Sequence, residues 1–145
     1  MTAGTSAGFG LRLAALIYDA FILAALLMIF TAAAMLFTHG HALLYPTIGR
    51  WVLLYRAGLG AVIAGYFVLN WHYGGQTVGM RAWRLVVVDL GGGPPKYAAA
   101  VARLFWAALA WAPLALGVLW LYVDSEGLTL QDRLSDTRMV RLPRS

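Results

Sequence analysis

Charge and cysteine are scarce in this chain of 145 residues. Only 12% of the residues are charged and 61% are hydrophobic, and the mean hydropathy is +0.73. A soluble domain usually carries about 25% charged residues, so much of this surface is expected to face something other than water. No cysteine is present, which excludes disulfides. The length allows one domain, which we place over residues 1–145 with its core at about 12–140.

Groups suited to catalysis or metal binding are also few. No motif places a base beside a serine or threonine, so an enzyme is the least favoured class and no cofactor is expected. His39 and His41 form an H-x-H pair. A metal site normally needs three or four ligands, and no cysteine or nearby carboxylate completes this one, so we expect no metal.

Three apolar runs occupy most of the chain: Leu11 to Phe37, Trp51 to Tyr73, and Tyr97 to Val123. About 20 apolar residues span a bilayer as a helix, whereas a secretory signal has an apolar core of only about 7–15 residues. Pro113 interrupts the third run, because proline removes a backbone donor. The predicted fold class is an all-α membrane protein with three apolar helical segments, the third broken near a proline, and short amphipathic or strand-like cytoplasmic elements.

The basic residues indicate a membrane surface as the partner, because they flank the apolar runs. The net charge of +5 is therefore assigned to anionic lipid on the cytoplasmic face, and no nucleic acid is expected. If the third run crosses the membrane once, the 11 basic residues divide almost evenly between the two sides. If it returns, all except Arg50 and Arg56 lie on one side. The return topology is favoured, because positive residues concentrate on the cytoplasmic side.

An internal repeat also favours the return. The motif G-x-T-[VL]-x-x-R-x6-V begins at Gly75 and again at Gly127. Its four identical positions are Gly75, Thr77, Arg81 and Val88 in the first copy and Gly127, Thr129, Arg133 and Val140 in the second. Each copy precedes a strand-like stretch, 85–89 and 137–142. Two such strands can pair and hide their edges only if they lie on the same side of the membrane. Chance similarity remains the alternative, because only four positions are identical.

Small residues recur in the second run, where Gly60 with Ala64 and Ala61 with Gly65 are each four positions apart. This spacing allows helix backbones to approach closely in lipid. The pattern predicts helix packing against either the first helix or another subunit.

The chain resembles the RDD family of small integral membrane proteins in three ordered segments. These are Arg12-Leu-Ala-Ala-Leu-Ile-Tyr-Asp19, the stretch from Gly75 to Asp89, and the tail from Leu130 to Val140. The resemblance implies that the family's one arginine and two aspartates are Arg12, Asp19 and Asp132. It also implies a membrane location, and a transport role has been proposed for some members. Met80, Gln131 and Ser135-Asp136 depart from the family pattern, which puts a basic contact and a tight turn at those points in doubt.

Asp19 is the most informative residue, because an ionisable group within a membrane helix costs roughly 2.5–3.5 kcal/mol at the centre and needs a partner. Arg103 is expected at a similar depth if the first and third runs begin on the same side. We therefore predict an Asp19–Arg103 pair, with Arg12 or Asp132-Arg133 closing the network. The pair either fixes helix register or lets Asp19 bind a proton or cation. Asp132 itself is expected at the wet interface, as an N-cap or paired with Arg133.

The expected function is that of a multi-pass protein of the cell inner membrane or plasma membrane, involved in ion or proton transport. A homo-oligomer is invoked because three apolar segments enclose little volume. The alternative is a non-catalytic accessory or scaffold subunit of a larger membrane complex.

Overall fold

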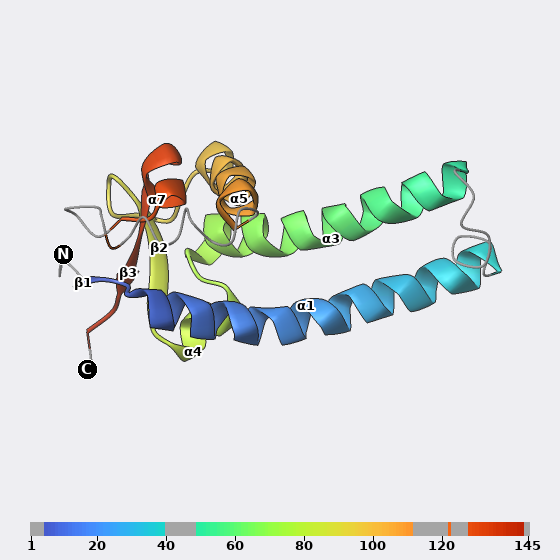
Figure 1. Ribbon diagram of the computed structural model, residues 1–145, viewed down its shortest axis with the longest axis horizontal. Helices are drawn as coiled ribbons and strands as arrows, with labels where there is room; N and C mark the ends of the chain where they lie inside the picture. The colour runs from blue at the N-terminus through green and yellow to red at the C-terminus, as the bar shows by residue number, and fades with distance from the viewer. Residues whose placement is uncertain (1–4, 40–48, 112–121, 123–127, 144–145) are drawn as a thin grey trace.

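Two long helices form the body of the protein. The computed structural model describes residues 5–39, 49–111, 122 and 128–143. Helix α1 (Phe9–Thr38) and helix α3 (Arg50–Gly74) lie side by side as a long hairpin, and the remaining elements gather at one end of it (Figure 1). We call this the sheet end, since the N-terminal strand and the C-terminal strand both lie there (Figure 1).

Both hairpin helices are long and apolar enough to cross a membrane. No residue in the most apolar 18-residue window of α1 is buried, and large apolar side chains such as Phe21, Met28 and Leu36 are exposed. Exposed apolar surface of this extent is not expected in contact with water. Buried residues of α1 end at Asp19, and the stretch 20–38 that follows is roughly 28 Å long as a helix, close to the hydrocarbon thickness of a bilayer.

The sheet end holds three antiparallel strands in the order β1-β3-β2: Thr5–Ser6 (β1), Leu85–Asp89 (β2) and Thr137–Arg141 (β3). A short helix precedes each of the last two strands, Val78–Ala82 (α4) before β2 and Leu130–Leu134 (α7) before β3. Threonine caps both helices, since the side chains of Thr77 and Thr129 accept hydrogen bonds from backbone N–H groups three residues ahead.

The internal repeat is therefore a structural one, and the predicted strand pair is confirmed. We call Thr77–Asp89 the first repeat unit and Thr129–Arg141 the second, since their caps, helices and strands correspond one to one. Leu85 pairs with Arg141, Val87 with Met139 and Asp89 with Thr137. Equivalent positions Val87 and Met139 thus face each other, so a local two-fold relation exchanges the two units. Both units lie at the same end of the hairpin (Figure 1).

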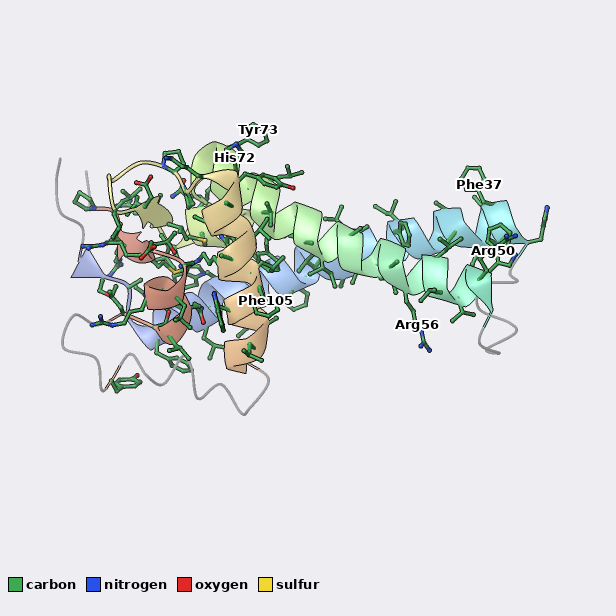
Figure 2. All side chains as sticks on the ribbon, turned by 90° about the horizontal axis from the view of Figure 1, so that it is seen from above. Phe37, Arg50, Arg56, His72, Tyr73 and Phe105 are labelled. Carbon is green, nitrogen blue, oxygen red and sulfur yellow. The ribbon has the colours of Figure 1, made fainter. Side chains whose placement is uncertain are left out.

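Helix α5 (Tyr97–Trp111) covers the first part of the third apolar run. It lies across α3 beside the sheet end and does not run along the hairpin (Figures 1 and 2). The break expected near Pro113 lies outside the described residues. The described residues thus contain two spanning-length helices and a shorter apolar one.

The small residues of α3 differ in whether they contact the first helix. Gly58 faces the ring of Phe30 on α1, so this part of the hairpin is closely packed. A methyl group at Gly60 or Gly65 would have no described atom within 4 Å. Helix α1 therefore does not pack against α3 at Gly60 or at Gly65.

Candidate functional site

A buried triad of charges joins α1, α5 and α7. The carboxylate of Asp132 is held between Arg12 Nη1 at 2.8 Å and Arg103 Nη1 at 2.6 Å. The relative exposures are 6% for Arg12, 1% for Arg103 and 1% for Asp132. Arg103 also donates to Thr137 Oγ1 at 2.7 Å, and Arg12 Nε donates to the carbonyl of Ala7 at 2.8 Å. The triad therefore joins the first helix to α5, to the central strand β3 and to the residue that follows β1.

Asp132 is oriented by the local structure of α7. It forms a capping box with Thr129, in which Thr129 N–H donates to Asp132 Oδ2 at 3.1 Å and the Thr129 side chain accepts from Asp132 N–H. Burial acts to raise the pKa of Asp132, but the nearby Arg103 and Arg12 outweigh it and hold the pKa below its ordinary value. Asp132 is therefore an anion that its surroundings keep ionised.

Asp19 forms a second buried centre, which joins α1, α3 and α4. Its Oδ1 accepts from Tyr66 Oη at 2.6 Å and from Gly79 N–H at 2.8 Å, and its Oδ2 accepts from the hydroxyl of Thr77. Thr77 is also the cap of α4, so one hydroxyl both starts the helix and ties it to α1. Asp19 thus receives backbone and side-chain donors at the start of α4.

Close approach of two backbones makes this contact possible. A methyl group at Gly79 would collide with the carbonyl oxygen of Ala15 and lie 2.9 Å from the carboxylate of Asp19. Glycine is required there because its missing Cβ lets α4 reach α1.

The predicted Asp19–Arg103 pair is wrong. Among the described residues, Arg103 pairs with Asp132 and Asp19 receives only neutral donors. The depth argument assumed that the third run begins parallel to the first helix, whereas α5 lies across α3 (Figure 2). The expected involvement of Arg12 and Asp132 was right, but they form a network with Arg103 and without Asp19.

The expectations for Asp132 and for the tail turn are also corrected. Asp132 is not at a wet interface but 1% exposed, and its ion pairs go to Arg12 and Arg103, whereas Arg133 is exposed. The tight turn at 135–136 is present although glycine is missing, because Asp136 adopts a φ of 51°. Met80 is buried at 3%, so the position with the missing family lysine contributes to the core instead.

The repeat residues serve mainly to shape the backbone. Gly75 ends α3 with a φ of 65°, and Thr77 and Thr129 are fully buried caps. Arg81 and Arg133 occupy equivalent positions near the helix ends and are exposed. Gly127 lies outside the described residues, as does His41 of the H-x-H pair.

Several site residues were not predicted. Tyr66, Trp71, Gln131 and Thr137 all contact the two centres or the cavity between them. Tyr66 and Trp71 were hidden within an apolar run in which aromatic residues are common. Their spacing of five along α3 carries no signal that separates a hydrogen-bonding aromatic from a lipid-facing one.

A cavity of about 400 Å³ lies between the two centres. Asp19, Arg12, Arg103, Gln131, Thr77 and Trp71 form its polar part. Leu16, Ile63, Phe67, Leu104, Ala107 and Ala108 form most of its apolar wall. Such a mixture of apolar walls and a few converging polar groups is typical of ligand pockets.

The fold and the two buried centres define a class of small helical protein, with a two-helix hairpin suited to a bilayer and a compact sheet end built from a repeat. The family model described as the RDD family matches residues 6–136, which is most of the chain. The chain belongs to the RDD family, as its motifs predicted. No curated protein and no solved structure gives a match.

Proposed function

We propose that the protein is a transport-type membrane protein in which Asp19 binds a proton or a monovalent cation. The observation that carries the proposal is the set of neutral donors around this buried carboxylate. Asp132 has two guanidinium partners, whereas Asp19 has two hydroxyls and one backbone N–H. A buried charge without a counter-ion is costly, so a proton or a cation at Asp19 would offset that cost.

The chemistry of the site suits either occupant. Three kinds of oxygen atom meet at this site: the carboxylate of Asp19, the phenol of Tyr66 and the hydroxyl of Thr77. Hard cations prefer oxygen ligands. Asp19 also lines the cavity, which supplies a place for an ion or water to reach it. The site lies where buried residues of α1 give way to exposed apolar ones, at the expected depth of the membrane boundary.

The orientation and the assembly state belong to the same proposal. Among the described basic residues, only Arg50 and Arg56 lie at the far end of the hairpin (Figure 2), so we assign the sheet end to the cytoplasmic side of a cell inner membrane or plasma membrane. The two spanning-length helices of the described residues enclose no private pathway, so the proposed transport uses a homo-oligomer.

The test is flux through purified protein reconstituted in liposomes that contain a pH-sensitive dye. Addition of Na⁺ or K⁺ outside should change the internal pH with wild-type protein. Asp19→Asn should reduce the flux to the protein-free level, because asparagine has nearly the same side-chain shape as aspartate but carries no negative charge. Asp136→Asn, at an exposed position, is the matched control and should leave the flux unchanged.

Tyr66→Phe provides an independent arm. It keeps the carboxylate but removes one oxygen, so the Na⁺ concentration for half-maximal flux should rise. A folded Asp19→Asn protein with wild-type flux would contradict the proposal.

A second candidate function is that of an accessory or scaffold subunit. It is favoured by the open space at Gly60 and Gly65 on α3, where small residues leave room for a helix from another protein. Under this candidate the isolated protein is inert in liposomes and co-purifies with a fixed membrane partner. Gly65→Leu should release that partner, whereas Gly10→Leu, with equally open space on α1, should retain it.

A further inference from the structure

Within the part of the chain that the structure describes, four buried polar atoms around the cavity lack a hydrogen-bond partner. They are Arg12 Nη2, Arg103 Nε, Trp71 Nε1 and Gln131 Oε1. Their residues are between 1% and 8% exposed, and all four line the cavity. Buried polar groups are nearly always paired, because an unpaired one loses its hydrogen bonds to water without replacement. Four such atoms around one cavity indicate a binding site for a ligand that supplies their hydrogen-bond partners.

The orphaned donors around the cavity indicate that its occupant carries an oxyanion. Asp19 lines the cavity too, but its carboxylate already receives three donors of its own. Three of the four atoms are N–H donors, and two belong to guanidinium groups. Arg12 and Arg103 share the single carboxylate of Asp132, so the triad keeps one positive charge in excess. Each Asp132 oxygen already contacts one guanidinium, and Oδ2 also accepts from Thr129 N–H. An oxyanion is the group that the remaining donors fit.

Gln131 Oε1 and the apolar wall of the cavity restrict the chemical class of the occupant further. Gln131 Oε1 requires a donor, which a plain carboxylate lacks and a hydroxyl next to a phosphate supplies. Leu16 on α1 and Ile63 on α3 belong to the apolar wall of the cavity, and Ile63 lies farther from the sheet end along α3 than Trp71 does. The exposed apolar stretch 20–38 indicates that lipid tails lie beside this part of the hairpin.

We infer that the cavity binds an anionic phospholipid of the sheet-end leaflet. The phosphate lies against Arg12, Arg103 and Trp71, a headgroup hydroxyl donates to Gln131, and the upper part of an acyl chain lies along Leu16 and Ile63. The lipid site shares its cavity with Asp19 but uses other residues, so it does not rest on the ion-binding role proposed for Asp19. Its test measures binding and not flux.

The test is native mass spectrometry of the detergent-purified full chain, titrated with phosphatidylglycerol or with phosphatidylcholine of the same acyl chains. Phosphatidylglycerol should bind with one tight site per chain and at least tenfold more strongly than phosphatidylcholine. Phosphatidylglycerol should also raise the melting temperature of the wild-type protein.

Two conservative variants probe the orphaned atoms without removing a charge. Trp71→Phe replaces the indole and its N–H donor by an apolar aromatic ring. Gln131→Met replaces the amide by an apolar group of similar length. Each should weaken phosphatidylglycerol binding about five- to tenfold, as the loss of one hydrogen bond to a phosphate or a hydroxyl predicts. The control is Trp83→Phe, at an exposed position outside the cavity lining, which should bind like wild type.

A wall variant distinguishes a lipid from a free phosphate. Ala107→Leu fills the apolar wall and should block phosphatidylglycerol, whereas Ala98→Leu on the exposed face of α5 should not. Inorganic phosphate that competes with phosphatidylglycerol and binds Ala107→Leu normally would overturn the lipid in favour of a small anion. Equal binding of the two lipids, unchanged in Trp71→Phe and Gln131→Met, would overturn the site and leave water as the occupant.

Discussion

The two repeat units share one backbone plan but attach to their helices with opposite chemistry. The first unit presents a neutral helix start, Thr77 and Gly79 N–H, to a carboxylate on α1. The second unit presents its own carboxylate, Asp132, to arginines on α1 and α5. The same capped turn can therefore act as a donor or as an acceptor, depending on the residue three positions after the cap: Met80 in one unit and Asp132 in the other.

The packing differs as well. Gly79 lets α4 touch α1, because a methyl group there would meet the carbonyl of Ala15 and the carboxylate of Asp19. The equivalent position in the second unit is Gln131, whose side chain lines the cavity with an unpaired oxygen. At this one position the first unit is closed against α1, whereas the second unit is open toward the cavity. Gly79 is therefore expected mainly to stabilise the fold, and Gln131 mainly to bind a ligand.

The largest effect should come from Asp132→Asn, which leaves two buried guanidinium groups without their counter-ion. The free energy of unfolding should fall by about 3–5 kcal/mol, as for other broken buried pairs. Thermal melting of the detergent-solubilised protein measures it. Asp136→Asn lies on the same turn but is exposed and keeps a residue that tolerates positive φ, so it should change stability by less than about 0.5 kcal/mol. Equal losses in both variants would show that the triad is not the source.

Acidification should weaken the second unit without any mutation. The pKa of Asp132 is lower in the folded protein than in the unfolded chain, so its ionised form stabilises the fold above the unfolded pKa of about 3.9. This stability should be lost as the pH falls from about 4 through the lower folded pKa. Melting temperatures from pH 7 to pH 3 measure the loss. Asp132→Asn should show a smaller decline over the same range, and a parallel decline would assign the effect to other carboxylates.

The sequence predicted the charged residues of the site better than their pairing. Arg12, Asp19 and Asp132 are all buried. Each has polar partners, as a buried charge requires. The pairing of Asp19 with Arg103 failed because it depended on the direction of α5, which no periodicity encodes. The burial of Asp132 was missed because a polar tail usually stays in water, whereas the capping box of Thr129 directs this carboxylate inward.

The repeat shows the opposite outcome. Four shared identities predicted that the strands 85–89 and 137–142 pair on one side, and β2 and β3 do so with two-fold register. Strand pairing depends on local patterns and on a simple topological choice, and both are present in the sequence. The orphaned atoms around the cavity could not be predicted, because they follow from how three helices leave space between them.

Gly79→Ala tests the close contact of the first unit. The added methyl group would collide with the backbone of α1 at Ala15, and a backbone cannot move aside as a flexible side chain does. We expect a loss of about 1–3 kcal/mol in thermal unfolding. Gly65→Ala in α3 meets no described atom within 4 Å and should be neutral or stabilising by up to about 1 kcal/mol. Gln131→Ala, at the equivalent position of the second unit, should cost less than Gly79→Ala, and the reverse order would contradict the closed-and-open comparison.

The smallest effect concerns the turns that join each short helix to its strand. Arg84 and Asp136 occupy equivalent positions and have φ values of 56° and 51°. Left-handed backbone costs an ordinary L-residue roughly 1–2 kcal/mol, but aspartate visits it more readily because its short side chain bonds locally. Arg84→Gly should therefore stabilise the protein by several tenths of a kcal/mol up to about 1, whereas Asp136→Gly should change it less. Melting temperatures measured side by side can resolve the difference, since both positions are exposed and neither change removes a buried contact. A larger gain at Asp136 than at Arg84 would mean that the two turns are not equivalent in energy, although their backbones coincide.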